Sequence, residues 1–140
     1  MNTDYNELAR QLYSLQFGKL KGCVLFTDLT AGHGEEGVLL QLYFDGREET
    51  AGDLARKLGL TSGRIANILR QLEKKKYIVR TIGTDDRRKV LVSLTESGRR
   101  HIDRVYSRSL ARSAGMLDLL GEEDAHDLLR LFSRIAELSK

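Results

Sequence analysis

The sequence has no proline, a single cysteine and no long apolar run. Without proline, glycines and helix-capping residues have to mark the ends of helices and strands. The lone Cys23 excludes an internal disulfide framework and fits a reducing compartment. No apolar stretch approaches the roughly 18 residues that a membrane span needs, and the N-terminus lacks the basic and apolar blocks of a secretory signal. We therefore expect a cytoplasmic protein that has no membrane partner.

The charges are distributed unevenly along the chain. The 140 residues carry a net charge of only +3, but residues 56–104 contain 14 Lys or Arg and 5 Asp or Glu, a balance of +9. The remaining 9 basic and 15 acidic residues give a balance of −6. A basic middle between acidic ends is expected of a module that binds a polyanion. A solvated helix face rich in lysine would have the same composition, so the geometry of the basic segment must decide between them.

Apolar spacing and capping residues predict a mainly helical chain. Thr50 and Asp53 have the three-residue spacing of a capping box, and Thr61 is a good N-cap that follows a turn at Gly59. The segment after the first helix could extend that helix in its first half, while its glycines at 32, 34 and 37 favour a loop. The predicted helices cover about Thr3–Gly18, Glu35–Phe44, 51–58, Thr61–Lys75, Glu96–Leu120, and a last helix that follows the acidic start "GEED".

Two short helices joined by a tight turn at Gly59 have the pattern of a helix-turn-helix. After them, Ile78, Arg80 and Ile82 alternate at period two, as do Val90, Val92 and Leu94, which predicts two strands joined by a six-residue tip at 83–88. A helix-turn-helix followed by a β-hairpin is a winged helix. The predicted fold class is therefore mainly α with a small β-hairpin wing.

We predict one domain over residues 1–140. Within it, about 35–98 form the winged helix DNA-binding region, and about 3–30 and 96–139 form a helical dimerisation region. The last helix carries leucine-type residues at spacings of three, four and three, which either complete the core of one subunit or pair with a second copy. With so small a winged helix to pack on, pairing is favoured. The stripe consists of Leu128, Leu131, Ile135 and Leu138.

The helix at Thr61–Lys75 has one apolar and one basic face. At about 100° per residue, Ile68, Leu69 and Leu72 fall within about 60° of Ile65. The opposite face is basic and rich in amides, and it contains no acid. Asn and Gln side chains can pair with adenine and Arg with guanine, while a helix N-terminus favours phosphate. The predicted DNA-contacting residues of this helix are Thr61, Ser62, Gly63, Arg64, Asn67, Arg70, Gln71 and Lys74.

The hairpin tip is the second predicted contact. Residues two apart in an extended segment share a face, so Asp86 and Arg88 can pair while Arg87 points the other way. We expect this pair to shape the tip, Arg87 to enter a narrow minor groove, and Lys89 to approach a flanking phosphate. Lys74, Lys75 and Lys76 are placed for contacts with phosphate that do not depend on sequence. A charged hairpin that serves only solubility is the alternative.

The run "TAGDLARKLGLTSGRIANILRQLEKKKYIVRTIGTDDRRKVLVSLTESG", residues 50–98, resembles the MarR family of transcriptional regulators. The pieces that carry the resemblance are "LARKLGL", "LEKKKYI" and "DDRRKVLVSLTESG". The flanking helices agree in layout alone. The resemblance implies a homodimer, held by its N- and C-terminal helices, that binds a palindromic operator. It also implies a repressor that a small ligand or an oxidant releases from DNA.

By position, Ser62, Gly63, Arg64 and Asn67 match the start of the family's recognition helix, Arg87 its minor-groove arginine, and Asp86 and Arg88 its wing-shaping pair. Lys76 departs from the pattern, because the family commonly has glycine where this helix ends. A lysine in a left-handed conformation costs on the order of 1 kcal/mol, and a helix that ends later or differently is the alternative.

Other chemistry has little support in the sequence. Cys23 lies in the region where some MarR relatives sense oxidants, so a redox-sensing regulator is one alternative, but a buried core thiol fits better. The three histidines, at 33, 101 and 126, show no spacing typical of metal ligands. The five tyrosines are interpreted as packing residues that could also line an effector pocket. There is no phosphate-binding glycine loop or nucleophile motif, so we predict neither an enzyme nor a cofactor. A protein-interaction adapter built on a winged helix is the remaining alternative.

Overall fold

The computed structural model describes residues 3–18, 34–46, 48–83 and 85–138. These residues form six helices and a three-stranded sheet. None of the described helices has the length and apolar character that crossing a lipid bilayer requires. In chain order the elements are α1 (Tyr5–Gly18), α2 (Glu35–Asp45), β1 (Glu49–Thr50), α3 (Ala51–Leu58), α4 (Ser62–Lys74), β2 (Ile78–Ile82), β3 (Val90–Leu94), α5 (Glu96–Leu120) and α6 (Glu122–Leu138).

The chain forms two compact units, and α5 contributes to both of them. The winged helix unit contains α2, α3, α4, the sheet and α5 as far as Val105. The terminal unit contains α1, α6 and α5 from Tyr106 onward. The first turns of α5 therefore belong with the winged helix, whereas the sequence suggested that the helical flank begins at residue 96.

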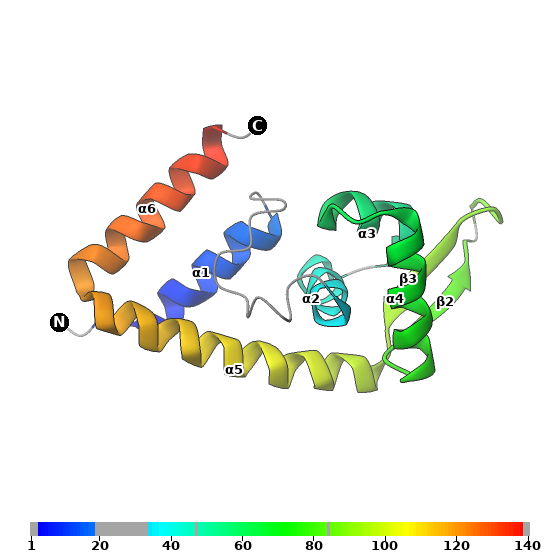
Figure 1. The fold of residues 1–140 in the computed structure, drawn as a ribbon, viewed down its shortest axis with the longest axis horizontal. Helices are drawn as coiled ribbons and strands as arrows, with labels where there is room; N and C mark the ends of the chain where they lie inside the picture. Colours follow the sequence, from blue (N-terminus) through cyan, green and yellow to red (C-terminus); the bar gives the residue numbers. More distant parts are fainter. Residues whose placement is uncertain (1–2, 19–33, 47, 84, 139–140) are drawn as a thin grey trace. The chain divides into compact units, whose positions relative to one another are not determined.

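In the winged helix unit, three helices surround one end of the sheet and the β2–β3 hairpin projects beyond them (Figure 1). The strand order is β1-β3-β2, and both pairings are antiparallel. The two-residue strand β1, which the sequence did not predict, pairs Glu49 with Val92 and Thr50 with Leu91. The predicted apolar face of the Thr61–Lys75 helix, Ile65, Ile68, Leu69 and Leu72, is buried. In α3, Leu54 is buried as well and Leu58 is half-buried.

The predicted helix starts are confirmed by their caps. The Thr50 and Thr61 side-chain oxygens accept hydrogen bonds from the main-chain nitrogens of Asp53 and Arg64, at 3.1 and 3.2 Å. Thr95 does the same for Gly98 at 2.9 Å. Each cap satisfies a helix N–H group that would otherwise lack a partner, so the three threonines fix where α3, α4 and α5 begin.

Helix α4 ends in a left-handed turn at Lys76, whose φ is 65°. The nitrogen of Lys76 donates to the carbonyl of Glu73, and that of Tyr77 donates to the carbonyl of Leu72, both at 3.0 Å. These two bonds form a Schellman motif, with lysine in the position that favours glycine. The alternative of a helix that ends later or differently is therefore wrong.

The start of α5 rests directly on this turn. The Thr95 hydroxyl donates to the Lys76 carbonyl at 2.6 Å, and the Thr95 nitrogen donates to the Tyr77 carbonyl at 3.0 Å. A Cβ atom placed on Gly98 would lie 2.0 Å from the Tyr77 carbonyl oxygen. Only glycine allows so close an approach, and it holds α5 against the end of α4.

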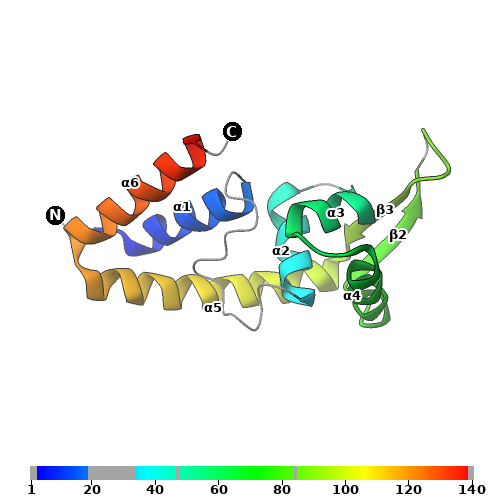
Figure 2. The ribbon, with the colours of Figure 1, turned by 45° about the horizontal axis from the view of Figure 1, so that its top comes forward.

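In the terminal unit, α1 packs against α6, and both views show the two helices side by side (Figures 1 and 2). Tyr13 is fully buried and meets the Tyr106 ring edge-to-face, with centroids 5.3 Å apart. Phe132 and two alanines form the buried side of α6. Most of the predicted leucine stripe lies outside this core, and Leu128 is half-buried. Three of its members, Leu131, Ile135 and Leu138, are 47%, 47% and 75% exposed.

Candidate nucleic-acid interface

The face of α4 opposite its buried side is open to solvent. Since Leu54, Ile65 and Leu69 anchor the helix from within, its polar side chains project outward from a rigid element. Thr61 is exposed while its oxygen caps the helix, and its hydroxyl proton is still able to contact a phosphate. The residues predicted to contact DNA from this helix are all exposed, namely Thr61, Ser62, Gly63, Arg64, Asn67, Arg70, Gln71 and Lys74.

Glu73 is the one acidic residue in the sequence of α4. Its carboxylate lies 3.7 Å from the guanidinium of Arg80 on β2. The pair offsets the negative charge beside the basic face, and it links the recognition helix to the first strand of the wing. The alternation of Ile78, Arg80 and Ile82 predicts a strand but does not indicate which residue Arg80 contacts.

The tip of the wing is a tight turn that has Arg87 at its apex. The Lys89 nitrogen donates to the Asp86 carbonyl at 3.1 Å, so Arg87 and Arg88 are the two central residues of a four-residue turn. The Asp86 carboxylate accepts from the main-chain nitrogen of Arg88 at 3.0 Å and from its guanidinium at 3.2 Å. These two contacts, the main-chain one first, lower the pKa of the Asp86 carboxyl. The predicted pairing of Asp86 with Arg88 is present, and Arg87 is exposed.

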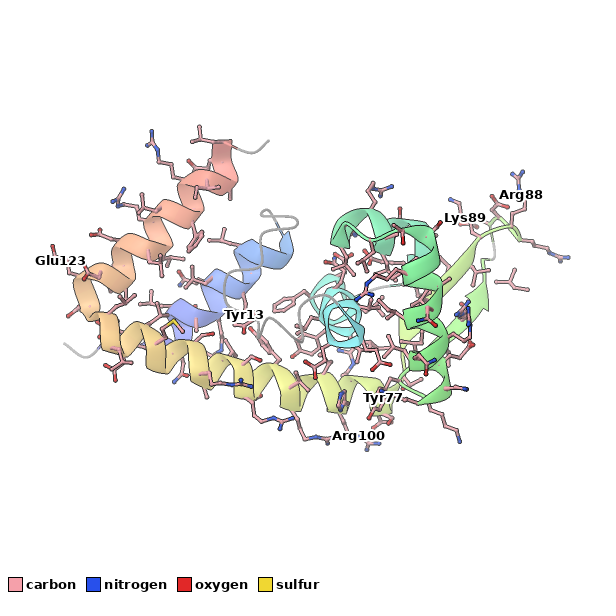
Figure 3. The ribbon with its side chains drawn as sticks, viewed as in Figure 1. Tyr13, Tyr77, Arg88, Lys89, Arg100 and Glu123 are labelled. Atoms are coloured by element: carbon pink, nitrogen blue, oxygen red, sulfur yellow. The ribbon has the colours of Figure 1, made fainter. Side chains whose placement is uncertain are left out.

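Gly83 closes the other side of the tip. Its nitrogen donates to the Lys89 carbonyl at 2.9 Å, and a Cβ atom added to Gly83 would lie 2.8 Å from the Asp86 carbonyl oxygen. The tip is therefore packed tightly against its own backbone. Lys89, which the sequence placed over a flanking phosphate, lies with Arg88 at this end of the hairpin (Figure 3).

The C-terminal end of α4 forms a second basic region. Lys74, Lys75 and Lys76 are exposed, as is Arg100 in the first turns of α5. Lys75 is partly neutralised, since its ammonium lies 2.7 Å from the Glu35 carboxylate, a contact that raises the pKa of Lys75. Lys74 and Lys76 are therefore the better placed of the three lysines for contact with phosphate.

A partly buried ionic cluster includes Lys57 of α3, and no sequence motif indicated it. The Lys57 ammonium lies 2.7 Å from the Asp45 carboxylate and also bonds the Glu49 carboxylate. Glu49 is only 5% exposed, and the described residues give its second carboxylate oxygen no hydrogen-bond partner. Burial, together with the neighbouring Asp45, raises the pKa of Glu49 to about 7. The cluster joins α2, β1 and α3.

The cysteine, histidines and tyrosines that the sequence offered as possible sensor, metal or pocket residues differ in where they lie. Cys23 and His33 lie outside the described residues. The His101 ring stacks on Tyr77 with centroids 4.5 Å apart, and Tyr43 donates to Asp103 at 3.2 Å, so these rings serve packing and hydrogen bonding. The part of the chain that the structure describes contains no group of three or more potential metal ligands.

An open pocket of about 630 Å³ lies between α1 and α6 in the terminal unit. Its lining is mixed in polarity and includes an ion pair between Glu7 and Arg10 at 3.4 Å. The other lining residues are Gln11, Ser14, Leu15, Leu129 and Ser133.

Known proteins resemble this chain in sequence and in fold. The family described as "winged helix DNA-binding domain" matches residues 37–111, more than half of the chain. The uncharacterised HTH-type transcriptional regulator YcgE of Bacillus subtilis is 32% identical over 88 residues, which cover 63% of this chain and 55% of YcgE. The chain thus spans little more than half the length of this relative.

Solved regulators share the fold. The Staphylococcus aureus MepR–DNA complex superposes with a TM-score of 0.62 at 25% identity and covers 76% of this chain and 78% of MepR. The transcriptional repressor CouR, bound to a 23-mer duplex, has a TM-score of 0.62 at 24% identity and covers 94% of this chain and 83% of CouR.

The relatives found in sequence and in structure are transcriptional regulators rather than enzymes. The family match at 37–111 includes the helix-turn-helix and the wing, the elements on which the resemblance to MarR regulators was based. The chain belongs to the winged helix DNA-binding domain family.

Proposed function

We propose that the protein is a dimeric, sequence-specific regulator that represses transcription by binding a palindromic operator. In this proposal α4 enters the major groove, and Asn67, Arg70 and Gln71 contact base edges. The wing tip reaches the adjacent minor groove through Arg87. The observation that carries the proposal is the exposure of an acid-free polar face on α4 next to a hairpin whose turn presents Arg87 at its apex.

The contacts divide into two kinds. Ser62 and Gly63 lie at the N-terminus of α4, where main-chain N–H groups favour phosphate, and Lys74 and Lys89 are exposed cations. These residues hold the protein on the duplex whatever its sequence. Asn67 lies further along the exposed face of α4, and its amide can discriminate between bases. MepR and CouR, which share the fold, have both been solved with DNA, in support of a duplex as the partner.

A second copy of the chain fits the exposed apolar residues of the terminal unit. Leu131, Ile135 and Leu138 recur along α6 at spacings of four and three, the spacing by which two helices pair. In a dimer of this kind, two α4 helices would contact half-sites about one helical turn apart, roughly 34–36 Å. Release by a small ligand or an oxidant is the regulation that we propose, and it accords with the pocket between α1 and α6.

The test is selection of bound duplexes from a random library, followed by titration of the selected duplex with two variants. Arg87→Ala should weaken binding to most sequences about equally, because it removes a contact with the groove rather than with one base. Asn67→Ala should relax discrimination at one or two base pairs, with a loss of about 1–3 kcal/mol at those positions. Unchanged affinity in both variants would contradict the proposal.

Salt dependence provides an independent measurement. A dimer that neutralises about 6–10 phosphates should lose about 10³–10⁵-fold in affinity between 50 and 200 mM salt. Repeating the titration with candidate ligands and with oxidant tests release. A duplex that is selected but never released by either would leave the DNA-binding proposal standing and overturn the regulatory one.

A further inference from the structure

Two exposed apolar side chains lie opposite each other near the tip of the wing. Ile82 at the end of β2 pairs across the hairpin with Val90 at the start of β3. Ile82 is 68% exposed and Val90 is 42% exposed. Cross-strand partners have Cβ atoms about 5 Å apart, so the two side chains form one small apolar surface.

This surface lies on the face of the wing that looks toward α4. Residues two apart in a strand share a face, so Ile82 shares its face with Arg80 and Ile78. Ile78 is buried, and Arg80 reaches Glu73 of α4. Beyond that ion pair, toward the tip, the same face is exposed at Ile82.

The strand conformation alone does not require apolar residues at these positions. Threonine is also β-branched and has a similar preference for strands, and it would expose less apolar surface to water. An isoleucine that is two-thirds exposed therefore gains nothing from the fold of the hairpin that threonine would not supply. Its position between the Arg80–Glu73 pair and the turn at Arg87 places it within the candidate interface.

We propose that Ile82 and Val90 make an apolar contact with the deoxyribose rings of DNA. The proposal rests on the proposed function, in which α4 occupies the major groove and the tip enters the minor groove. One sugar–phosphate strand separates those two grooves, and the α4-facing side of the wing has to cross it. The sugars are the apolar part of that strand and the phosphates its anionic part. The wing matches this pattern, with an apolar pair at Ile82 and Val90 followed by the cations Arg87, Arg88 and Lys89.

The test uses Ile82→Thr and Val90→Thr in the full chain, with the duplex selected from the random library. Each variant should lower affinity by about 5–20-fold, because it removes apolar area from the interface. The slope of affinity against salt should be unchanged, since no cation is lost, whereas Arg87→Ala should reduce that slope by about two, one for each subunit of the dimer. Thermal unfolding should be unaltered, because the positions are exposed.

Val79→Thr is the matched control. Val79 lies on the same strand, is 43% exposed and points to the opposite face of the hairpin, opposite Ser93. It should bind as the wild type does. Equal affinities for Ile82→Thr, Val79→Thr and wild type would overturn this inference while an effect of Arg87→Ala left the proposed function intact. If the wild type bound no duplex, both proposals would fall together.

Discussion

The Asp86 carboxylate accepts two hydrogen bonds from Arg88, one from the main-chain nitrogen of Arg88 at 3.0 Å and one from its guanidinium at 3.2 Å. These bonds hold the Arg88 side chain against the turn, although it is 93% exposed. Its neighbour Arg87 is left at the apex. An exposed pair of this kind contributes little to stability, so its importance is in the shape that it gives to the tip.

The first prediction concerns this pair. Asp86→Ala removes both bonds and should loosen the tip, so that ordering it becomes part of the cost of binding DNA. We expect operator affinity to fall about 3–10-fold, as measured by fluorescence anisotropy, with little change in thermal unfolding. Asp85→Ala is the control, because it removes the same charge from the adjacent exposed residue. It should leave affinity unchanged or raise it slightly, and equal losses in both variants would count against a shaping role.

The pH dependence of this contact follows from its pKa. The hydrogen bonds from Arg88 lower the pKa of Asp86 below its ordinary value of 3.8. A depressed carboxyl pKa means that the stabilisation is present above the ordinary value and is lost as the pH falls through the lowered one. Asp86 should therefore contribute no pH dependence to operator binding between about pH 5 and 8.

The second prediction concerns the end of α4. Lys76 adopts a φ of 65°, which costs a residue with a side chain on the order of 1 kcal/mol. Lys76→Gly should remove this strain and raise the free energy of unfolding by up to about 1 kcal/mol, measured by urea denaturation. The same change removes a cation from each subunit's interface, so operator affinity should fall and the salt slope of the dimer should decrease by about two.

Lys74→Gly is the matched control for that substitution. It removes the same charge, but from the last residue of the right-handed helix. Glycine there should destabilise the protein by about 0.5–1 kcal/mol. Opposite signs for the two variants would support the strain at Lys76, and destabilisation by both would refute it.

The third prediction concerns the buried cluster of Asp45, Glu49 and Lys57. Burial raises the pKa of Glu49 to about 7 from an ordinary value of 4.5. Between these values the folded chain keeps a proton that the unfolded chain has released. The stabilisation from protonated Glu49 is thus complete below about pH 4.5 and is lost as the pH rises through about 7. We expect stability to fall by about 1–3 kcal/mol between pH 5 and 8 from this group.

Glu49→Gln tests the assignment, since its amide resembles the protonated carboxyl in shape and can donate a hydrogen bond to Asp45. The variant should match the wild type near pH 5 and exceed its stability at pH 8, as followed by circular dichroism in urea. Glu48→Gln changes an exposed neighbour and should retain the wild-type pH profile. A wild-type profile in Glu49→Gln would show that another group titrates.

Much of the winged helix could be predicted because local chemistry determines it. Thr50, Thr61 and Thr95 mark helix starts through bonds within three residues, and Ile78–Ile82 and Val90–Leu94 alternate along both strands of the hairpin. The pairing of Asp86 with Arg88 is also local, since donor and acceptor are two apart in sequence. The spacing of apolar residues and the presence of helix-capping residues are sufficient to predict features that depend on residues close in sequence.

Features that depend on distant residues could not be predicted in this way. The strand β1 has two residues and exists through its pairing with Val92. The cluster around Glu49 joins side chains 8 and 12 residues apart in sequence. Position 98 must be glycine because the Tyr77 carbonyl, 21 residues earlier, lies against it. Lys76 adopts a left-handed backbone conformation, although a lysine ordinarily prefers a right-handed one. In each case tertiary contacts outweigh local preference.

The last prediction concerns the apolar stripe of α6, which the sequence left open between core and pairing. The core of the terminal unit uses Phe132, Ala125 and Ala136, while Ile135 remains 47% exposed. If a second copy covers the stripe, Ile135→Glu buries a charge in the interface and should shift the protein toward monomer. Sedimentation equilibrium would measure the shift. Operator affinity should fall with it, because two linked α4 helices bind far more tightly than one.

Arg130→Glu is the control for Ile135→Glu. It places a glutamate about 140° around α6 from Ile135, at an exposed position outside the stripe. The dimer should survive this change, so a difference between the two variants isolates the stripe from a general effect of added negative charge. Dissociation by both variants would point to electrostatic repulsion between subunits. Dissociation by neither would mean that Leu131, Ile135 and Leu138 remain exposed in solution and that the two DNA-reading helices are joined through another surface.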